Sequence, residues 1–482
     1  MGRFTNACLA FGRSLFGYGY DAIAPSNKRE RIQVHNGTED EILKQQDRAS
    51  LISVSRTLHR NSSIVQWMVE RHLDFVSSFT YQCMHPDKGF KRAVEELIRE
   101  RSKRENADVT GRFRLDKIVR LSECSRTTDG DLLHVHLASN KIQTISGDRI
   151  RNRDGADQEG WINGVRLRKD GSVRSYGIYR RRYGGYEWER ELSAENAFLH
   201  GYFRRGSQYR GISPLASACN GLRDIYTTME LARAKMKVGQ IFALALTSDP
   251  NPIPGVPDIA GNATTQEKPR GDGTTVRTTK VDFGAGPQVL QLRGNEKAEF
   301  LESNAPGSGF LDLHEAEIAV ALKCLDLPYS FFDESHTNFV GQLAALQLYK
   351  VACRTKRDDN IELLDWHTDR WLTNAVLAGD LTLPRGMTVD QVPYAWIPIG
   401  LPWWDKAKQI RGELAAISGG LGNPQETCRE MGGEFEHNID QMAAALEYAD
   451  EKLSRFGVRL RWDNPTPINV LPVAEPVEAP ES

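Results

Sequence analysis

The residues most able to do chemistry, by type and spacing, lie in the segment FRRGSQYRGIS at 203–213. Its arginines and glycines could bind phosphate, because a guanidinium donates paired hydrogen bonds and glycine lets the backbone approach a ligand. Ser213 and Pro214 predict the N-cap and first turn of a helix, and a helix N-terminus attracts anions. The other interpretation is structural: Arg205 and Arg210 would contact carboxylates or backbone at a domain or subunit junction.

Other catalytic and cofactor motifs are weak or missing. His134 and His136 lie two apart on a predicted strand, a spacing that can hold a metal, but the sequence offers no third ligand nearby, so we favour a structural pair. There is no Walker A, HExxH or GxSxG pattern, and GAG at 284–286 lacks the third glycine of a dinucleotide site. We therefore expect no catalytic residue, no metal, no cofactor, and no enzyme activity.

Composition places the chain among globular proteins with a real core. The 482 residues are 40% hydrophobic and 26% charged, with a formal net charge of -2, which argues against tight nucleic-acid binding. No apolar run reaches the ~18 residues of a membrane span, so we expect no membrane partner. The seven cysteines form no CxxC pair, as in reduced intracellular proteins.

The first half of the chain predicts helices followed by strands. Residues 1–45 lack a sustained period and predict an arm. Apolar residues at helical spacing predict a helix pair from Leu51 to Val76, broken near Asn61 or Ser62. A third helix is expected at 90–104. LLHVHLA then predicts a strand, and alternation on both sides of the sequence KDG at 169–171 predicts a hairpin.

The second half predicts mainly helices around one irregular insertion. The helix that begins at Ser213 continues to about 240. Residues 248–287 are rich in proline, glycine and threonine without a period, so we expect an irregular insertion, followed by a short strand at 289–292. Residues 342–378 contain no glycine or proline and predict one helix of about 55 Å, or two segments. Two further helices are expected between 400 and 460.

The arginine segment resembles phage portal proteins of the lambda family. Their pattern has histidine, a short apolar stretch, then Arg-Pro-Gly-Gln-x-Arg-Gly-x-Ser-x-Leu before a helix. Here Arg205, Gln208, Arg210 and Gly211 match it within HGYFRRGSQYRGISPL, and Gly-Ser replaces the Pro-Gly pair. Further similar segments are SRTLHRNSSIVQWMVERHLDFVSS, DGDLL, EIAVALKCLDLPYSFF, GLPWWDKAKQI and the C-terminal GGLGN…FGV region, so the resemblance covers roughly 45–460.

The resemblance implies a fold and a domain order. The fold would be α+β, predominantly helical, with the portal regions called wing, stem, clip and crown. The expected divisions are an arm at 1–45, a wing at 46–212 that is helical and then β-rich, a stem helix and clip-like insertion at 213–300, a second stem or wing part with a long channel helix at 301–399, crown-like helices at 400–460, and a disordered tail at 461–482.

The resemblance also implies a function. Portal proteins form dodecameric rings at one capsid vertex, through which double-stranded DNA passes without sequence specificity. The implied partners are further copies of the chain, the terminase large subunit, the major capsid protein and a head-tail connector. The location would be the virion, after assembly in the host bacterial cytoplasm. Two alternatives stay open: a nucleic-acid-processing enzyme that uses the arginine loop on phosphate, and another structural or adaptor protein of a phage particle.

One basic cluster is a candidate for contact with DNA or with a neighbouring subunit. It comprises Lys350, Arg354, Lys356 and Arg357 on the predicted long helix. The competing interpretation is a solvated helix face, which carries such charges without a binding role.

Overall fold

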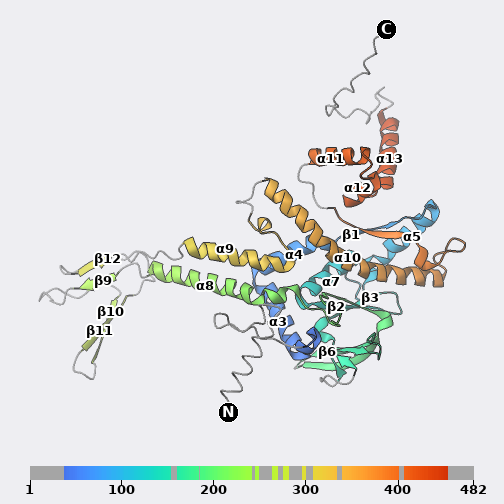
Figure 1. The fold of residues 1–482 in the computed structure, drawn as a ribbon. Helices are drawn as coiled ribbons and strands as arrows, with labels where there is room; N and C mark the ends of the chain where they lie inside the picture. The colour runs from blue at the N-terminus through green and yellow to red at the C-terminus, as the bar shows by residue number, and fades with distance from the viewer. Residues whose placement is uncertain are drawn as a thin grey trace, which may run out of the picture.

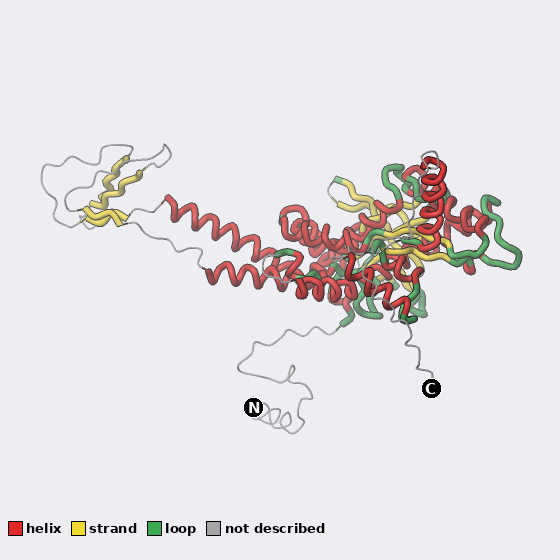
Figure 2. The backbone as a smooth tube through the Cα atoms, turned by 90° about the horizontal axis from the view of Figure 1, so that it is seen from above, coloured by secondary structure: helices red, strands yellow, loops and turns green. Residues whose placement is uncertain are grey.

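The fold is α+β and mainly helical, as expected (Figure 1). The computed structural model describes residues 37–153, 160–183, 185–241, 245–248, 263–269, 275–281, 296–299, 308–333, 339–400, 406–431 and 433–453. A body of helices and small sheets carries a long helical extension on one side and a separate group of short helices near the C-terminus (Figures 1 and 2). No helix within these ranges is both long and apolar enough to cross a membrane.

The first part of the body consists of helices. Ser62 has extended backbone angles and separates α3 from α4, which confirms the predicted break. Residues 37–44, which the sequence places in an arm, pack against the body, and Asp40 is only 2% exposed. The helices are α2 (Glu39–Ile42), α3 (Gln45–Asn61), α4 (Ser63–Val76), α5 (Lys88–Arg101), α6 (Arg104–Ala107) and α7 (Leu115–Asp129).

Two antiparallel sheets follow α7. One has the order β3-β2-β8 and the other β4-β5-β6-β7, and they enclose an apolar core around Leu133, Ile145 and Ile178. The predicted hairpin is confirmed, because β5 and β6 flank Gly171, whose φ of +83° suits glycine. The strands are β2 (Asp131–His136), β3 (Ile142–Ser146), β4 (Trp161–Ile162), β5 (Val165–Leu167), β6 (Val173–Arg182), β7 (Gly185–Ser193) and β8 (Ala197–Gly201).

A helical hairpin extends away from the body. A short 3-10 turn, Pro214–Ser217, leads into α8 (Cys219–Ile241), and α9 (Ser308–Leu322) returns beside it (Figures 1 and 2). The side chain of Ser213 accepts the Leu215 amide, so Ser213 is an N-cap as predicted, but it caps the 3-10 turn, and α8 itself begins later than expected, at Cys219. Near the body the two helices share a core with α4, so the hairpin is anchored by apolar packing at its base.

The insertion at the tip contains strands, which corrects the expectation of an irregular segment. β10 (Ala263–Pro269) pairs with β11 (Thr275–Val281), and β9 (Ala245–Ser248) pairs with β12 (Glu296–Glu299). The threonines that we took as a sign of irregular structure are β-branched and favour extended backbone. The strand expected at 289–292 lies outside the described residues.

The longest helix is α10 (Phe339–Ala378), one continuous helix of 40 residues with a contour length of about 60 Å. It begins three residues before the predicted start and ends where Gly379 adopts a φ of +81°. Before it, the chain leaves α9 through a 3-10 turn and Asp326, whose φ is +61°. Two apolar cores meet α10: its first half packs with α4 and α9, and its second half with α5 and α7.

The C-terminal region has three helices where we expected two: α11 (Lys406–Ser418), α12 (Pro424–Glu430) and α13 (Phe435–Leu453). Two turns connect these helices, and the first, between α11 and α12, was predicted at GGLGN, where Asn423 caps α12. The second was missed: there the Gly433 amide donates to the Cys428 carbonyl and ends α12. The preceding strand β13 (Tyr394–Pro398) pairs with β1 (Phe79–Cys83). The expected tail at 461–482 lies outside the described residues.

Candidate functional site

Arg210 lies at the centre of the arginine loop and is completely enclosed. Its Nε and Nη2 donate to both carboxylate oxygens of Asp131, at 2.6 and 2.9 Å. Nη1 and Nη2 also donate to three backbone carbonyls, those of Ile150, Asn163 and Gly147. Burial opposes the charge, but Asp131 raises the pKa of Arg210 on balance. All five N–H donors therefore have partners within the chain, and none is left for a phosphate.

A second buried pair locks the loop from the other side. Asp40 accepts from Arg48 Nη2 at 3.3 Å and from the Tyr209 amide at 2.6 Å. Arg48 Nη1 donates to the Gly211 carbonyl at 2.5 Å. Burial and the positive charge of Arg210 lower the pKa of Arg48 to about 10, although Asp40 and Asp131 oppose this effect. The segment that begins at α2 is therefore part of the loop's scaffold.

Gly211 is required by a close approach of two backbones. A Cβ atom at Gly211 would lie 2.0 Å from the Gly130 carbonyl oxygen, well inside van der Waals contact. The Tyr202 amide donates to that same oxygen at 2.9 Å, so the Gly130 backbone is held in place. The Gly211 amide donates to Asp131 at 2.9 Å. The glycine of the motif thus allows the loop to contact the turn between α7 and β2.

Gln208 bridges the loop to itself. Its side-chain oxygen accepts the Arg204 amide at 3.0 Å, and its side-chain nitrogen donates to the Tyr202 and Arg210 carbonyls. Arg205 differs from the other motif residues because its side chain is 69% exposed and pairs with Glu39 at 2.9 Å. The structure therefore brings Gln208, Arg210 and Gly211 together as an internal corner, while Arg205 lies at the surface.

A buried polar network lies beside this corner. Glu123 accepts from Arg126 Nε at 2.8 Å, from Asn360 at 3.1 Å, and lies 2.8 Å from His72 Nε2. Burial would raise the pKa of Glu123, but Arg126 and the nearby histidines hold it well below its usual range. Arg126 also pairs with Asp359 at 2.6 Å. This network joins α4 and α7 to α10.

His134 and His136 meet a third histidine that the sequence analysis missed. His367, on α10, lies 2.8 Å from His136 Nε2 through Nδ1 and 3.2 Å from His134 Nδ1 through Nε2. Because His367 uses both ring nitrogens on its neighbours, the three rings form a hydrogen-bonded chain. No group of His, Cys, Asp or Glu side chains in the described part is arranged to hold a metal. No local spacing could reveal His367, which is 231 residues from His136.

The candidate basic cluster on α10 is divided by the structure. Lys350 and Arg354 are exposed. Lys356 instead donates to the Leu325 carbonyl at 2.8 Å and pairs with Asp326 at 2.9 Å. Arg357 donates to the Phe75 carbonyl at 2.8 Å. Only the first two residues present their charges to solvent, whereas the other two fasten α10 to neighbouring segments.

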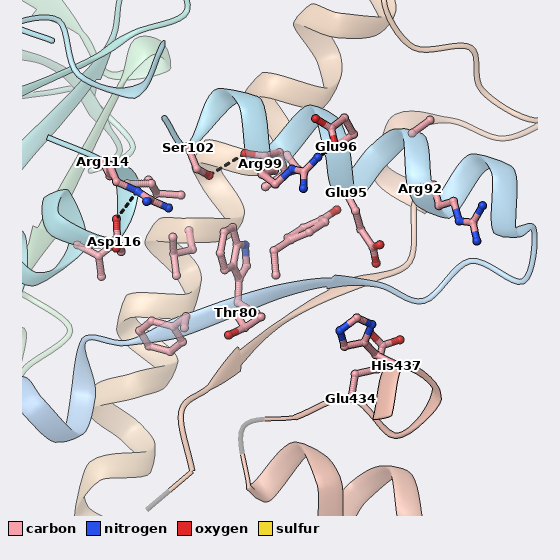
Figure 3. Close-up of a pocket in the computed structure, with 18 of the residues that line it drawn as sticks. Thr80, Arg92, Glu95, Glu96, Arg99, Ser102, Arg114, Asp116, Glu434 and His437 are labelled. Carbon is pink, nitrogen blue, oxygen red and sulfur yellow. Dashed lines mark hydrogen bonds and ion pairs between the residues drawn. The ribbon is translucent and has the colours of Figure 1, made fainter. Parts of the chain in front are cut away.

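An open groove of about 910 Å³ lies between α5, β1 and the start of α13 (Figure 3). Many of its charged residues already have local partners: Arg99 pairs with Glu96, and Arg114 lies 3.6 Å from Asp116. Lys91, beside the groove, pairs with Glu434. The figure shows these charges spread around the groove and not directed at one point.

Comparisons with known proteins bear on most of the chain. The family model described as "Phage portal protein, lambda family" matches residues 26–349. Three solved structures are similar at 11–12% identity, and each match covers 80% of this chain. They are a virion of a native gene transfer agent particle (TM-score 0.46, 93% of that chain covered) and the neck of an empty particle computed with C6 symmetry (TM-score 0.48, 94% of that chain covered). The third is the neck of a native particle computed with C12 symmetry (TM-score 0.47, 94% of that chain covered). No protein of curated function matches the sequence.

The match in 26–349 includes the arginine loop, the β-rich block, the α8–α9 hairpin and the start of α10. It extends over more than half of the chain and includes the segments of the resemblance up to EIAVALKCLDLPYSFF, whereas GLPWWDKAKQI and the GGLGN…FGV region lie beyond it. The chain belongs to the lambda family of phage portal proteins.

Proposed function

We propose that this portal protein acts as a ring of identical subunits, with a dodecamer as the expected size, at one vertex of a capsid. The observation that carries the proposal is the family match. Support comes from large apolar side chains that a single chain leaves in water: Val320 on α9 is 73% exposed, and Leu348 and Val351 on α10 are 74% and 71% exposed. Leu348 and Val351 lie about one helical turn apart, and neighbouring exposed apolar residues of this kind mark interaction surfaces.

The ring would serve as a conduit for DNA during packaging and ejection, without catalysis by this chain. The arginine loop supports a structural role, since Arg210 has no donor left for a substrate phosphate. The near-neutral net charge of -2 also suits a channel that does not hold DNA tightly, because each phosphate that a protein neutralises adds salt-sensitive affinity. Among the α10 cations, Lys350 and Arg354 are the two that we propose to meet DNA or a neighbouring subunit.

The regions of the chain can be assigned on this proposal. The body up to 212 forms the wing, and the α8–α9 hairpin forms the stem. The strands at its tip form the clip, α10 approaches the channel, and α11–α13 form the crown. The terminase large subunit and the head-tail connector would dock on this ring, and the major capsid protein would surround it. Assembly would take place in the host bacterial cytoplasm, and the ring would remain in the virion.

The position of the protein in the particle gives a test. Particles assembled with the full chain carrying a peptide label would be decorated with gold-conjugated antibody and imaged. The proposal expects label at one vertex of each capsid, at the tail attachment point. Label on the tail, on every vertex or nowhere on the particle would contradict it, and label on the tail would favour the adaptor alternative.

A further inference from the structure

The three C-terminal helices contain no buried side chain within the described residues of 407–453. Figure 1 shows them as a group beside the main body. Helices of this length are marginal in water by themselves and derive most of their stability from packing of an apolar face. A single copy of the chain leaves part of that face exposed, because Ile410, Leu414, Ile439 and Met442 are 43 to 55% exposed, so a further surface can cover it.

Helix α13 has an apolar row at the spacing of a coiled-coil seam. Its members recur at intervals of three and four residues; two of them, Ile439 and Met442, are 47% and 45% exposed, and the others are half-buried. The full row is Phe435, Ile439, Met442, Leu446, Ala449 and Leu453. At 100° per residue, one side of this row carries four carboxylates: Glu436, Asp440, Glu447 and Asp450.

Helix α11 has a similar row with the opposite charge beside it. Ile410 and Leu414, which are 43% and 55% exposed, continue to Ile417 at helical spacing. Arg411 lies next to this row. Over its length α11 has three cations and one carboxylate, a net charge of +2, whereas α13 has five carboxylates and one lysine, a net charge of -4. The two rows are therefore complementary in both apolar character and charge.

We propose that the apolar row of α13 packs against the apolar row of α11 in the adjacent copy of the chain, with Arg411 beside the carboxylates of α13. This inference rests on the ring proposed above and names one surface by which the ring closes. Two different surfaces meet in such a contact, and a contact of this kind closes into a ring when the rotation between neighbouring copies divides a full turn and involves no shift along the axis. Opposite charges beside the apolar rows fix which surfaces pair.

Charge reversal in the full chain tests the pairing. Arg411→Glu and Asp450→Arg would each raise the protein concentration needed for half-maximal ring assembly, by about two- to tenfold. The two changes together would restore it to within about twofold of the unchanged protein. Gln441→Arg, on the opposite side of α13, is the matched control and would leave assembly unchanged. Sedimentation velocity over a concentration series measures all four proteins.

Hydrogen exchange gives a second readout that does not depend on the variants. The amides of α11 and α13 would be protected in rings and would exchange rapidly in unassembled chains. Three results would overturn the pairing and leave the proposed function intact: single reversals that assemble as readily as the unchanged protein, a double variant that assembles no better than the single ones, or equally fast exchange in rings and in unassembled chains. If the unchanged protein forms no ring at any concentration, the proposed function itself is contradicted.

Discussion

Arg210 and Asp131 form a completely buried, two-pronged ion pair that joins the arginine loop to the start of β2. Both side chains have zero exposure, and the two N–O distances are 2.6 and 2.9 Å. Arg210 also bonds three carbonyls from the β-rich block, so one side chain holds together segments that lie 47 to 79 residues away in sequence. The loop that could have bound phosphate is instead an internal corner.

Removing the Arg210 side chain is expected to be severe. Arg210→Ala leaves the Asp131 carboxylate buried without its partner, and such changes cost about 3–5 kcal/mol of unfolding free energy. Arg205→Ala is the control from the same loop, and it should cost less than about 1 kcal/mol because that side chain is largely exposed. Urea unfolding at fixed protein concentration compares them. Equal losses for the two variants would contradict the structural role of Arg210.

Gly211→Ala should also destabilise the corner, although it removes no interaction. The added methyl group would lie 2.0 Å from the Gly130 carbonyl oxygen, so the loop or the turn must shift. Overpacking of this kind typically costs about 1–3 kcal/mol. Gly221→Ala, where a Cβ meets nothing within 4 Å, should leave the unfolding midpoint unchanged or raise it. A Gly211→Ala protein as stable as the unchanged chain would refute the close approach.

The histidine chain predicts that stability falls as the solution becomes acidic. Burial lowers the pKa of His134 and His367 well below 6.5 and that of His136 to about 4, so all three are neutral in the folded protein. The unfolded chain takes up these protons below about pH 6.5, and each histidine then costs up to about 1.4 kcal/mol per pH unit. For His136 this loss ends near pH 4, where the folded protein also protonates.

Other buried groups modify this effect. His72 and His200, whose pKa values burial also lowers, add to the loss on acidification. Asp365 opposes this loss of stability. Burial and the charge of Asp369 raise its pKa to about 6, so on acidification the folded protein binds this proton before the unfolded chain does. Thermal unfolding between pH 7.5 and 5.0 is the measurement. His367→Gln should flatten the pH profile, whereas His437→Gln, at an exposed position, should not. Parallel profiles for His367→Gln and the unchanged protein would exclude the chain as the source.

Lys350 and Arg354 provide a test of DNA binding by α10. If these exposed side chains meet DNA, replacing both by alanine should reduce the slope of log affinity against log salt by about one for each phosphate that is no longer neutralised. Lys356→Ala is the internal control, since that ammonium is already engaged by Asp326 and the Leu325 carbonyl. An unchanged slope with impaired ring assembly would assign the pair to a subunit interface instead.

Local chemistry determined the elements that the sequence predicted well. Ser213 and Pro214 start a helical segment. Gly171 forms the turn between β5 and β6, and Gly379 ends α10, in both cases through a positive φ. Each of these effects acts within a few residues of the chain. The tip of the hairpin was mispredicted for the same local reason, since threonine-rich segments were judged by their neighbouring prolines and glycines. The break before α13 was also missed, although the glycine pair at 432–433 is a local turn signal.

Long-range pairing determined the rest. Nothing in the sequence distinguishes Arg210 from Arg205, which lies five residues earlier; the difference arises because Asp131, 79 residues away, meets only Arg210. His367 likewise joins His134 and His136 only through the packing of α10 on β2. Lys356 and Lys350 share one helix but differ in their surroundings. Such assignments depend on tertiary packing, which spacing along one chain does not specify.

The most direct test of the central claim is the native mass of the purified full-length protein together with its appearance by negative-stain electron microscopy. We predict rings with a central channel and a mass near that of a dodecamer of the 54.2 kDa chain. A protein that remains monomeric at all concentrations would contradict the account, and one that also hydrolyses a nucleotide or cleaves DNA would favour the enzyme alternative.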